Sequence, residues 1–322
     1  MEHYVNWGIL GASNFALNEM APALHLAGRG RLAGIATRDV GKAAPFTRIA
    51  PDLNVHDSYD ALLADPMIDA VYIPLPHTMH VEWGMKALQA GKHVLVEKPT
   101  AMTTPEIQPL IEARDKSGLV ASEAFMIVHH PQWQMAREII ASGQLGQLQR
   151  VRAAFTYNNA ADTQNIRNKA AMGGGSLPDI GVYTIGSTRF ATGGTLREIY
   201  DAKIEYEGDC EVTAEARAGF DGFDAQWLTS MRMHPFQEVT FHGSDGVLRV
   251  PTPYNAGVFD QARLVIETGM ERREIRFPKV NQYVLQVENL NAAILDGAAL
   301  KWRLEDAVET QETIDAIRAK AG

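Results

Sequence analysis

The chain has 322 residues, 46% of them hydrophobic and 21% charged, a composition typical of a globular protein with a large core. A formal net charge of −9 argues against a nucleic-acid surface, which needs clustered cations, and the single cysteine, Cys210, excludes internal disulfides and thiolate metal cages. The opening MEHYVNWGIL is not typical of an export signal and the apolar runs are too short to span a bilayer, so we expect a cytoplasmic protein with small-molecule partners and no membrane partner.

The first third of the chain alternates short apolar runs with amphipathic segments. Strands are predicted at 4–10, 31–37, 69–73, 93–97 and 119–122. Strands separated by helices imply parallel crossovers, and runs that are apolar on both faces fit a sheet covered on both sides. Residues 1–123 are therefore predicted to form an α/β domain built on a doubly wound parallel sheet.

The pattern changes after about residue 123. From residue 147 onward, longer segments alternate apolar and polar residues, with GSDG and ETGM as turn signals. This predicts an open, mainly antiparallel sheet. Helices are predicted at about 131–141, 175–191, 283–296 and 305–320. Residues 124–322 are therefore predicted to form a second, α+β domain.

The turn GILGASNFA, residues 8–16, follows the first strand. Gly11 can supply a tight turn and Ala16 close helix packing, as in a dinucleotide-binding turn, but Ser13 stands where a glycine is usual. Serine is small, and its hydroxyl could donate to a phosphate oxygen at the helix N-terminus. The alternative is an ordinary strand-to-helix turn; the position at the first strand of an alternating α/β pattern favours a nucleotide.

The end of the second strand, GIATRD, bears on the cofactor. A site that prefers NAD usually has an acidic residue here, whereas Thr37 and Arg38 offer a hydroxyl and a guanidinium suited to a 2′-phosphate. This favours NADP, with NAD less suited. In the alternative, Arg38 is solvated and Asp39 binds the ribose.

The segment YIPLPHTMH follows the strand at 69–73, at the sheet edge where ligands bind in such folds. Pro74 and Pro76 fix an extended turn. His77 and His80 have the spacing of a metal pair, but no third ligand accompanies them, so we predict no metal site. We expect His77 to contact the cofactor ribose and His80 to have a helix-start or pocket role, with a structural role as the alternative.

The segment KHVLVEKPT delivers Glu97 and Lys98 to the same edge, where Pro99 ends the strand. A lysine in a nucleotide crevice can anchor a substrate hydroxyl or lower the pKa of a neighbouring acid. The alternative is a surface Glu–Lys pair.

The later segment MGGGSLPDIGVYTIG places Asp179 and Tyr183 four residues apart on one predicted helix face. A phenol has an ordinary pKa of ~10, so proton transfer near neutrality needs a nearby cation, a role that Lys98 could fill. In the alternative, Tyr183 is a core aromatic whose hydroxyl is capped by Asp179.

Together, WGILGASNFA, AGKHVLVEKP, EAFMIVHHPQW and NIRNKAAMGGGSLPDIGVY resemble the glucose-fructose oxidoreductase, inositol dehydrogenase and MocA family of NAD(P)-dependent oxidoreductases, nearest the branch with aldose and dihydrodiol dehydrogenases. The resemblance implies a Rossmann domain, Tyr183 as acid-base group, Lys98 between cofactor and substrate, and Asp179 as supporting carboxylate. It also implies a homodimer or homotetramer formed through the open sheet. The residues expected to bind the cofactor are Gly11, Ser13, Asn14, Phe15, Thr37, Arg38, Pro74, His77, His80, Glu97, Lys98 and Arg167.

The expected activity is hydride transfer between NADP(H) and a hydroxyl or carbonyl carbon of a sugar or polyol, in the form of an aldose 1-dehydrogenase. The alternatives are a trans-dihydrodiol dehydrogenase, a reductase of keto- or anhydro-sugars, or a sensor that binds NAD(P) without turnover. A sensor has no need of an acid-base pair, so the presence of Lys98, Asp179 and Tyr183 favours an enzyme.

Overall fold

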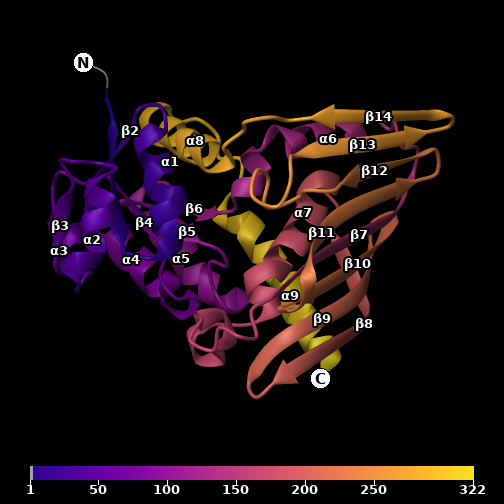
Figure 1. Cartoon of the computed structure of the whole chain (residues 1–322), viewed down its shortest axis with the longest axis horizontal. Helices are drawn as coiled ribbons and strands as arrows, with labels where there is room; N and C mark the ends of the chain where they lie inside the picture. Colours follow the sequence, from indigo (N-terminus) through magenta and orange to yellow (C-terminus); the bar gives the residue numbers. More distant parts are fainter. Residues whose placement is uncertain (1–2) are drawn as a thin grey trace. The chain divides into compact units, whose positions relative to one another are not determined.

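The computed structural model describes residues 3–322, which form two compact units (Figure 1). Unit 1 consists of the chain up to Met126 together with Asn281–Val308, and unit 2 of Ile127–Val280 together with Glu309–Gly322. The sequence prediction placed all residues after 123 in one second domain. The two descriptions differ mainly in 281–308, which pack with unit 1.

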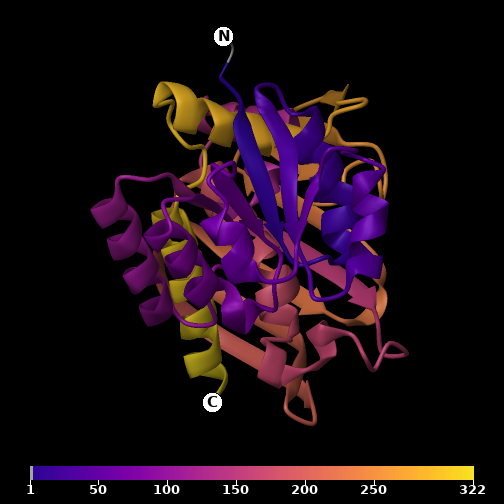
Figure 2. The same ribbon diagram turned by 90° about the vertical axis from the view of Figure 1, so that its left-hand side faces the viewer.

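Unit 1 contains a parallel sheet of six strands in the order β3-β2-β1-β4-β5-β6, flanked by helices in Figure 2. The strands are β1 Val5–Leu10, β2 Gly30–Ala36, β3 Asn54–His56, β4 Ala70–Ile73, β5 His93–Glu97 and β6 Ala121–Ala124. This confirms the predicted doubly wound sheet. The sequence prediction missed β3, because it has three residues, two of them exposed, and so gives no apolar run.

Two apolar clusters cover the faces of this sheet. One lies beneath α1 Ala21–Leu26, α2 Val40–Thr47 and α8 Gln282–Asp296; the other lies beneath α3 Tyr59–Ala64, α4 His80–Gln89 and α5 Thr104–Ser117. Helix α8 is attached by Val287 and Leu290, which are almost fully buried, and by Trp7, whose indole Nε1 donates to Asn291 Oδ1 at 2.9 Å. These contacts explain why residues far along the chain complete the first unit.

Unit 2 contains a sheet of eight strands in the order β14-β13-β12-β11-β7-β10-β9-β8. Only the β7–β10 pair is parallel, so the sheet is mainly antiparallel as predicted. Its strands are β7 Leu148–Asn158, β8 Leu196–Glu207, β9 Cys210–Phe220, β10 Phe223–Ser230, β11 Arg232–Gly243, β12 Gly246–Val250, β13 Arg263–Thr268 and β14 Glu271–Arg276.

Helices pack on one face of this sheet: α6 Pro131–Ala141 contacts β13, and α7 Val182–Thr192 contacts β7 and β10. Along each strand, side chains point alternately to this covered face and to the opposite, uncovered face. In β7, for example, Arg150 and Arg152 are exposed while Val151 and Ala153 are buried. The last helix, α9 Leu304–Ala321, begins in unit 1 and ends in unit 2. Among the described residues, every helix falls short of the length and apolar character needed to cross a membrane.

Candidate active site

The glycine-containing turn lies at the carboxyl end of β1. Gly11 has a φ of +108°, and its amide donates to Ala36 O at 3.0 Å. A Cβ on this residue would lie 3.2 Å from Leu75 Cδ2 and 3.4 Å from the Tyr59 hydroxyl. The positive φ therefore favours glycine here, and the Leu75 and Tyr59 side chains leave little room for a larger residue.

Ser13 caps the helical segment that follows. Its Oγ accepts a hydrogen bond from the Ala16 amide at 3.0 Å, and its carbonyl accepts one from Leu17 N at 3.0 Å, at the start of the π-helical turn Ala16–Met20. An accepting hydroxyl keeps its own proton for a second partner. Asn14 and Phe15, the next two residues, are exposed. The turn thus presents a helix N-terminus at the surface of unit 1, the arrangement that binds phosphate groups.

Of the three residues that follow β2, Thr37 and Asp39 bind backbone or each other, whereas Arg38 is exposed. The Asp39 carboxylate caps α2, since Oδ1 accepts a hydrogen bond from Gly41 N at 3.0 Å, and Thr37 Oγ1 accepts one from Asp39 N at 3.2 Å. Arg38 is exposed, and its charge lowers the pKa of Tyr59, against the larger effect of burial, which raises it. Arg38 is therefore close to the side chain that borders Gly11. The capping role of Asp39 weakens the alternative in which this carboxylate binds a ribose.

His77 and His80 follow β4 and Pro74, on the short helical turn His77–Met79 and at the start of α4. His80 is completely buried, and its ring nitrogens lie 2.7 Å from Pro99 O and 2.8 Å from Leu75 O. Burial lowers its pKa to about 4. Both facing groups are carbonyl oxygens, and the neutral imidazole donates to one of them, which supports the helix-start role; contact of His80 with a cofactor stays a prediction. Residues 3–322 contain no group of three His, Cys, Asp or Glu side chains placed to hold a metal ion.

Glu97 and Lys98 lie at the end of β5 as predicted for the strand. Tyr72 Oη donates to Glu97 Oε1 at 2.6 Å, and Lys98 N donates to Glu97 Oε2 at 3.2 Å. Burial raises the pKa of the Glu97 carboxyl, and the Lys98 charge opposes this effect. Lys98 itself has 8% of its surface exposed.

A second buried carboxylate near Lys98, Glu123, was missed by the sequence analysis. Its Oε1 accepts hydrogen bonds from the Thr100 amide and hydroxyl at 2.9 and 3.0 Å, and its Oε2 accepts one from Trp302 Nε1 at 2.9 Å. Burial raises the pKa of Glu123, and the Lys98 charge is one of the groups that lower it. The acidic residue within the apolar strand LVASEAF was the signal that could have identified this position.

Asp179 is the centre of the predicted site in unit 2. It lies in the π-helical turn Leu177–Gly181, directly before α7. Its Oδ2 accepts a hydrogen bond from the Tyr157 hydroxyl at 2.6 Å, and its Oδ1 accepts one from Arg167 Nε at 2.9 Å. The Asp179 side chain is 6% exposed and that of Arg167 41%. A buried carboxylate is thus compensated by one cation and one phenol.

Tyr183 lies one turn later, on α7, and is packed against aromatic rings. Its ring centroid lies 5.9 Å from that of Phe155 and 5.5 Å from that of Tyr254. Arg167 is close enough that the Tyr183 phenol influences its pKa, although the Asp179 charge is the main cause of the rise in the Arg167 pKa. Burial raises the pKa of Tyr157, and the Asp179 charge adds to that effect. Tyr157 was also missed, because nothing in the pattern of β7 distinguishes it from a packing aromatic.

The glycines before this helix permit close approach of backbone segments. A Cβ on Gly174 would lie 2.4 Å from Arg167 O, and a Cβ on Gly175, which has a φ of +141°, would lie 2.6 Å from Glu211 Cγ. The Gly175 amide donates to Arg167 O at 3.0 Å. The glycines therefore let the Arg167 segment lie against the start of the helix.

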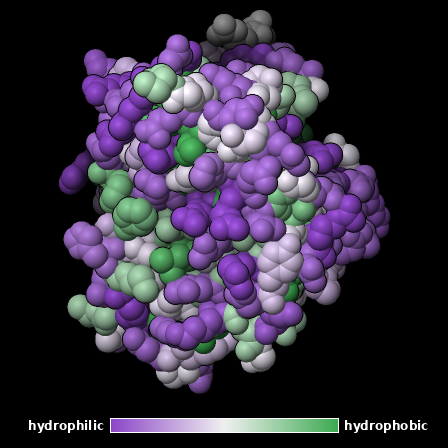
Figure 3. All heavy atoms as spheres, turned by 90° about the vertical axis from the view of Figure 1, so that its right-hand side faces the viewer, coloured by the Kyte–Doolittle hydropathy of each residue, from purple (hydrophilic) through white to green (hydrophobic). Residues whose placement is uncertain are grey.

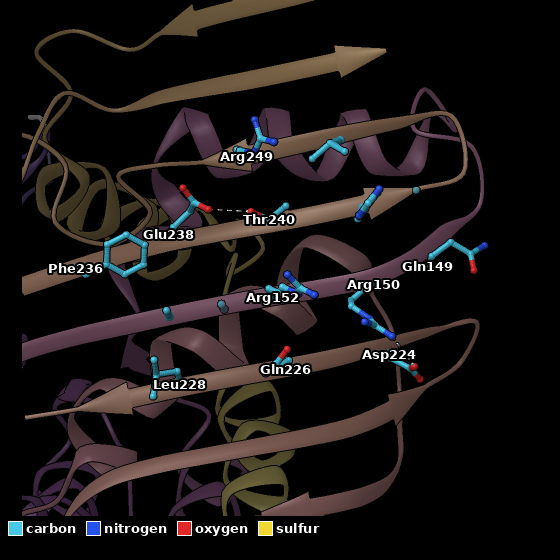
Figure 4. Close-up of a pocket in the computed structure, with 15 residues that line it drawn as sticks. Gln149, Arg150, Arg152, Asp224, Gln226, Leu228, Phe236, Glu238, Thr240 and Arg249 are labelled. Atoms are coloured by element: carbon cyan, nitrogen blue, oxygen red, sulfur yellow. Dashed lines mark hydrogen bonds and ion pairs between the residues drawn. The ribbon is translucent and has the colours of Figure 1, made fainter. Parts of the chain in front are cut away.

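A separate depression lies on the uncovered face of the unit 2 sheet (Figure 4). Polar groups and a few apolar ones line it, and Thr240 Oγ1 donates to Glu238 Oε1 at 3.1 Å. Its labelled residues are Gln149, Arg150, Arg152, Asp224, Gln226, Leu228, Phe236, Glu238, Thr240 and Arg249. None of the residues predicted for catalysis or cofactor binding lines it. Figure 3 shows hydrophilic and hydrophobic side chains interspersed on this side of the molecule.

The structure therefore places the predicted residues in two groups. In unit 1, the predicted cofactor residues other than Arg167 lie at or after the carboxyl ends of β1, β2, β4 and β5, together with Lys98. In unit 2, Arg167 and Asp179 form an ion pair next to Tyr183.

Comparison with known proteins matches both units. Residues 5–125 match the model of an oxidoreductase family with an NAD-binding Rossmann fold, and residues 133–249 match the GFO/IDH/MocA C-terminal domain. An uncharacterized oxidoreductase of Rhizobium meliloti is 34% identical over 326 residues, covering 98% of this chain and 97% of the relative. A D-xylose 1-dehydrogenase (NADP(+)) of Haloferax volcanii is 29% identical over 330 residues, covering 98% and 97%. A solved structure of a 3-ketoreductase from Actinomadura kijaniata in complex with NADP and TDP-benzene has a TM-score of 0.91 at 30% identity, covering 99% of this chain and 98% of that chain.

Proposed function

The chain belongs to the GFO/IDH/MocA family of oxidoreductases, and we propose that it transfers a hydride between NADP(H) and a hydroxyl or carbonyl carbon of a sugar-like substrate. The family membership confirms the resemblance seen in the sequence. One observation carries the catalytic part of the proposal: a buried Asp179 carboxylate, held by Tyr157 and Arg167, lies one turn before Tyr183.

The cofactor would be held by the carboxyl edge of the unit 1 sheet. The positive φ of Gly11 and the helix N-terminus capped by Ser13 suit a pyrophosphate, and the exposed Arg38 suits a 2′-phosphate. The NADP named for the Actinomadura and Haloferax relatives supports NADP over NAD. When bound, the nicotinamide supplies the hydride or accepts it.

Residues of this chain would manage the proton. Tyr183 takes the hydroxyl proton of the substrate during oxidation and returns it during reduction, and Lys98 stabilises the phenolate and orients the hydroxyl. Asp179 fixes the geometry of the helix that carries Tyr183, with Arg167 as its cation. The proposal needs no metal ion.

We propose an aldose 1-dehydrogenase as the specific activity, supported by the xylose dehydrogenase relative. A sugar ketoreductase is the second candidate, and the 3-ketoreductase neighbour at 30% identity favours it. Both candidates would use the same residues, the first to oxidise the C1 hydroxyl of an aldose and the second to reduce a carbonyl at another carbon of a keto-sugar. A trans-dihydrodiol dehydrogenase is the third candidate, supported by a trans-1,2-dihydrobenzene-1,2-diol dehydrogenase of Xenopus laevis that is 28% identical over 76% of this chain.

A substrate panel separates these candidates. Aldoses, polyols and dihydrodiols are offered with NADP⁺ and NAD⁺, and keto-sugars, both free and nucleotide-linked, with NADPH and NADH, while nicotinamide absorbance is followed. Turnover of a free aldose with NADP⁺ supports the first candidate, and turnover only of a nucleotide-linked keto-sugar supports the second. Tight NADPH binding without turnover of any compound would contradict both and favour a cofactor-binding sensor.

We also propose that the chain forms a homodimer or homotetramer through the uncovered face of the unit 2 sheet. Large apolar side chains such as Tyr200 and Phe236 are exposed there at 43% and 49%, and an open sheet face of this kind is commonly covered by a second copy. Sedimentation of the wild type and of a Phe236→Glu variant tests this: a wild-type monomer, or an unchanged variant, contradicts it.

A further inference from the structure

The first two residues of β9 contact both segments that supply the Arg167–Asp179 ion pair. Cys210 Sγ donates to the carbonyl oxygen of Arg167 at 3.3 Å, and Glu211 Oε1 accepts a hydrogen bond from Leu177 N at 2.7 Å. Leu177 begins the π-helical turn that contains Asp179. One strand end thus holds the backbone on each side of the ion pair.

Glu211 takes over the role of a missing helix cap. Ser176 stands at the N-cap position before Leu177, but its side chain makes no capping hydrogen bond, and its hydroxyl lies 3.1 Å from Thr229 Oγ1 instead. The first amides of a helix have no partner within the helix and need an acceptor from outside. The Glu211 carboxylate supplies that acceptor, and its negative charge complements the positive end of the helix dipole.

The surroundings of Glu211 fix its carboxylate on the other sides. Only 5% of the residue is exposed, and its Oε2 lies 3.4 Å from Nε of Arg318, on α9. Burial raises the pKa of Glu211, and the Arg318 charge opposes this. Gly175 allows the close approach, because a Cβ there would lie 2.6 Å from Glu211 Cγ and 2.9 Å from its Oε1. A side chain at position 175 would therefore occupy the space that the Glu211 side chain fills.

We propose that Glu211 is a positioning residue for the reaction: it holds the start of the helix so that Asp179 meets Arg167 and Tyr157. The Asp179 amide donates to Gly175 O, and Asp179 is only two residues after Leu177, so a shift of the Leu177 amide moves the carboxylate directly. The inference rests on the proposed function, since its consequence is measured in turnover.

The test compares Glu211→Ala with Glu211→Gln. Glutamine keeps an oxygen for the Leu177 amide but loses the ion pair with Arg318, whereas alanine loses both. We expect Glu211→Ala to lower kcat by about tenfold or more with an unchanged KM for NADPH, and Glu211→Gln to recover most of the loss, because small misplacements of catalytic groups are costly. Glu215→Ala, at an exposed position of the same strand, is the matched control. Wild-type kcat in Glu211→Ala, or equal losses in the alanine and glutamine variants, would overturn the proposal.

Hydrogen exchange keeps a failure of this inference apart from a failure of the proposed function. Amides of residues 173–183 should exchange faster in Glu211→Ala than in the wild type, and nearly normally in Glu211→Gln. This readout needs no substrate and is unaffected by a lower yield of folded protein. A wild type without turnover would contradict the proposed function alone. Unchanged exchange in Glu211→Ala would contradict the positioning role, whatever the wild type does.

Discussion

The Arg167 guanidinium donates to Asp179 across 2.9 Å, although the two residues come from different segments, a loop after β7 and the start of a helix. Removing the Asp179 charge leaves Arg167 without its main electrostatic partner. In the proposed mechanism this ion pair fixes the helix that carries Tyr183. We therefore expect Asp179→Asn to lower kcat roughly 10²-fold while NADPH binding is retained. Stopped-flow turnover and fluorescence titration with NADPH measure the two effects. Equal weakening of cofactor binding and turnover would show that Asp179 acts by another route.

Tyr183 and Lys98 are expected to contribute mainly to kcat. In the proposed mechanism Tyr183 exchanges a proton and Lys98 stabilises the phenolate, so Tyr183→Phe and Lys98→Ala should each lower kcat roughly 10²- to 10⁴-fold. NADP(H) affinity should persist in both. Steady-state kinetics with the substrate found in the panel provides the check, and full activity in both variants would remove these residues from the mechanism.

Ser13 should tolerate a small residue but not a large one. Ser13→Gly should leave the NADPH dissociation constant within about threefold, because glycine is also accepted at helix N-caps. Ser13→Leu should abolish binding, since its side chain would occupy the space of the pyrophosphate. Calorimetric titration of both variants, with thermal unfolding as a folding control, measures this. Normal binding by Ser13→Leu would mean that the turn does not hold a phosphate.

Arg38 is expected to set the choice between the two dinucleotides. Arg38→Ala should weaken NADP(H) binding by about 10- to 100-fold and leave NAD(H) binding nearly unchanged, because only NADP carries the phosphate that pairs with the guanidinium. The ratio of the two dissociation constants is the measurement. Arg48→Ala, at another arginine of unit 1, serves as the control. An equal loss for both cofactors would be inconsistent with a 2′-phosphate contact.

The buried His80 predicts a dependence of stability on pH. Its pKa is lowered in the folded protein from 6.5 to about 4, so unfolding takes up a proton between these values. The contribution of His80 to the free energy of unfolding is therefore greatest above pH 6.5. It decreases as the pH falls toward 4, by a total of about 3 kcal/mol. Urea unfolding of the wild type and of His80→Asn should show a difference in free energy that shrinks across this range. A constant difference between the wild type and His80→Asn across this range would refute the linkage.

Apolar runs and motif order were sufficient to predict the fold. The strand ends that carry Gly11, Thr37 and Lys98 follow from buried runs, because parallel strands bring their carboxyl ends to one edge. The same reasoning missed β3, whose residues are largely exposed, and assigned 281–308 to the second domain, since α8 has the amphipathic pattern of a helix in either unit.

The partners of the site residues could not be predicted in the same way. Tyr157, Glu123 and Glu211 act through contacts with residues 20 or more positions away, such as the 2.6 Å hydrogen bond from Tyr157 to Asp179. Single-sequence periodicity carries information about burial and neighbours three or four residues apart, not about such pairs. Asp39 is the opposite case. Its N-cap role at α2 could have been predicted from an aspartate directly before a helix, whereas the sequence prediction for Asp39 was ribose binding alone.

The attachment of α8 to the first sheet also has a consequence for biosynthesis. Trp7, Val287 and Leu290 belong to one apolar cluster, yet more than two hundred residues of synthesis separate the first from the others. When only the segment up to Met126 has emerged from the ribosome, part of one apolar face of its sheet is therefore still uncovered. We expect this nascent segment to be a client of chaperones that bind exposed apolar surface, and its release to await emergence of α8 from the exit tunnel.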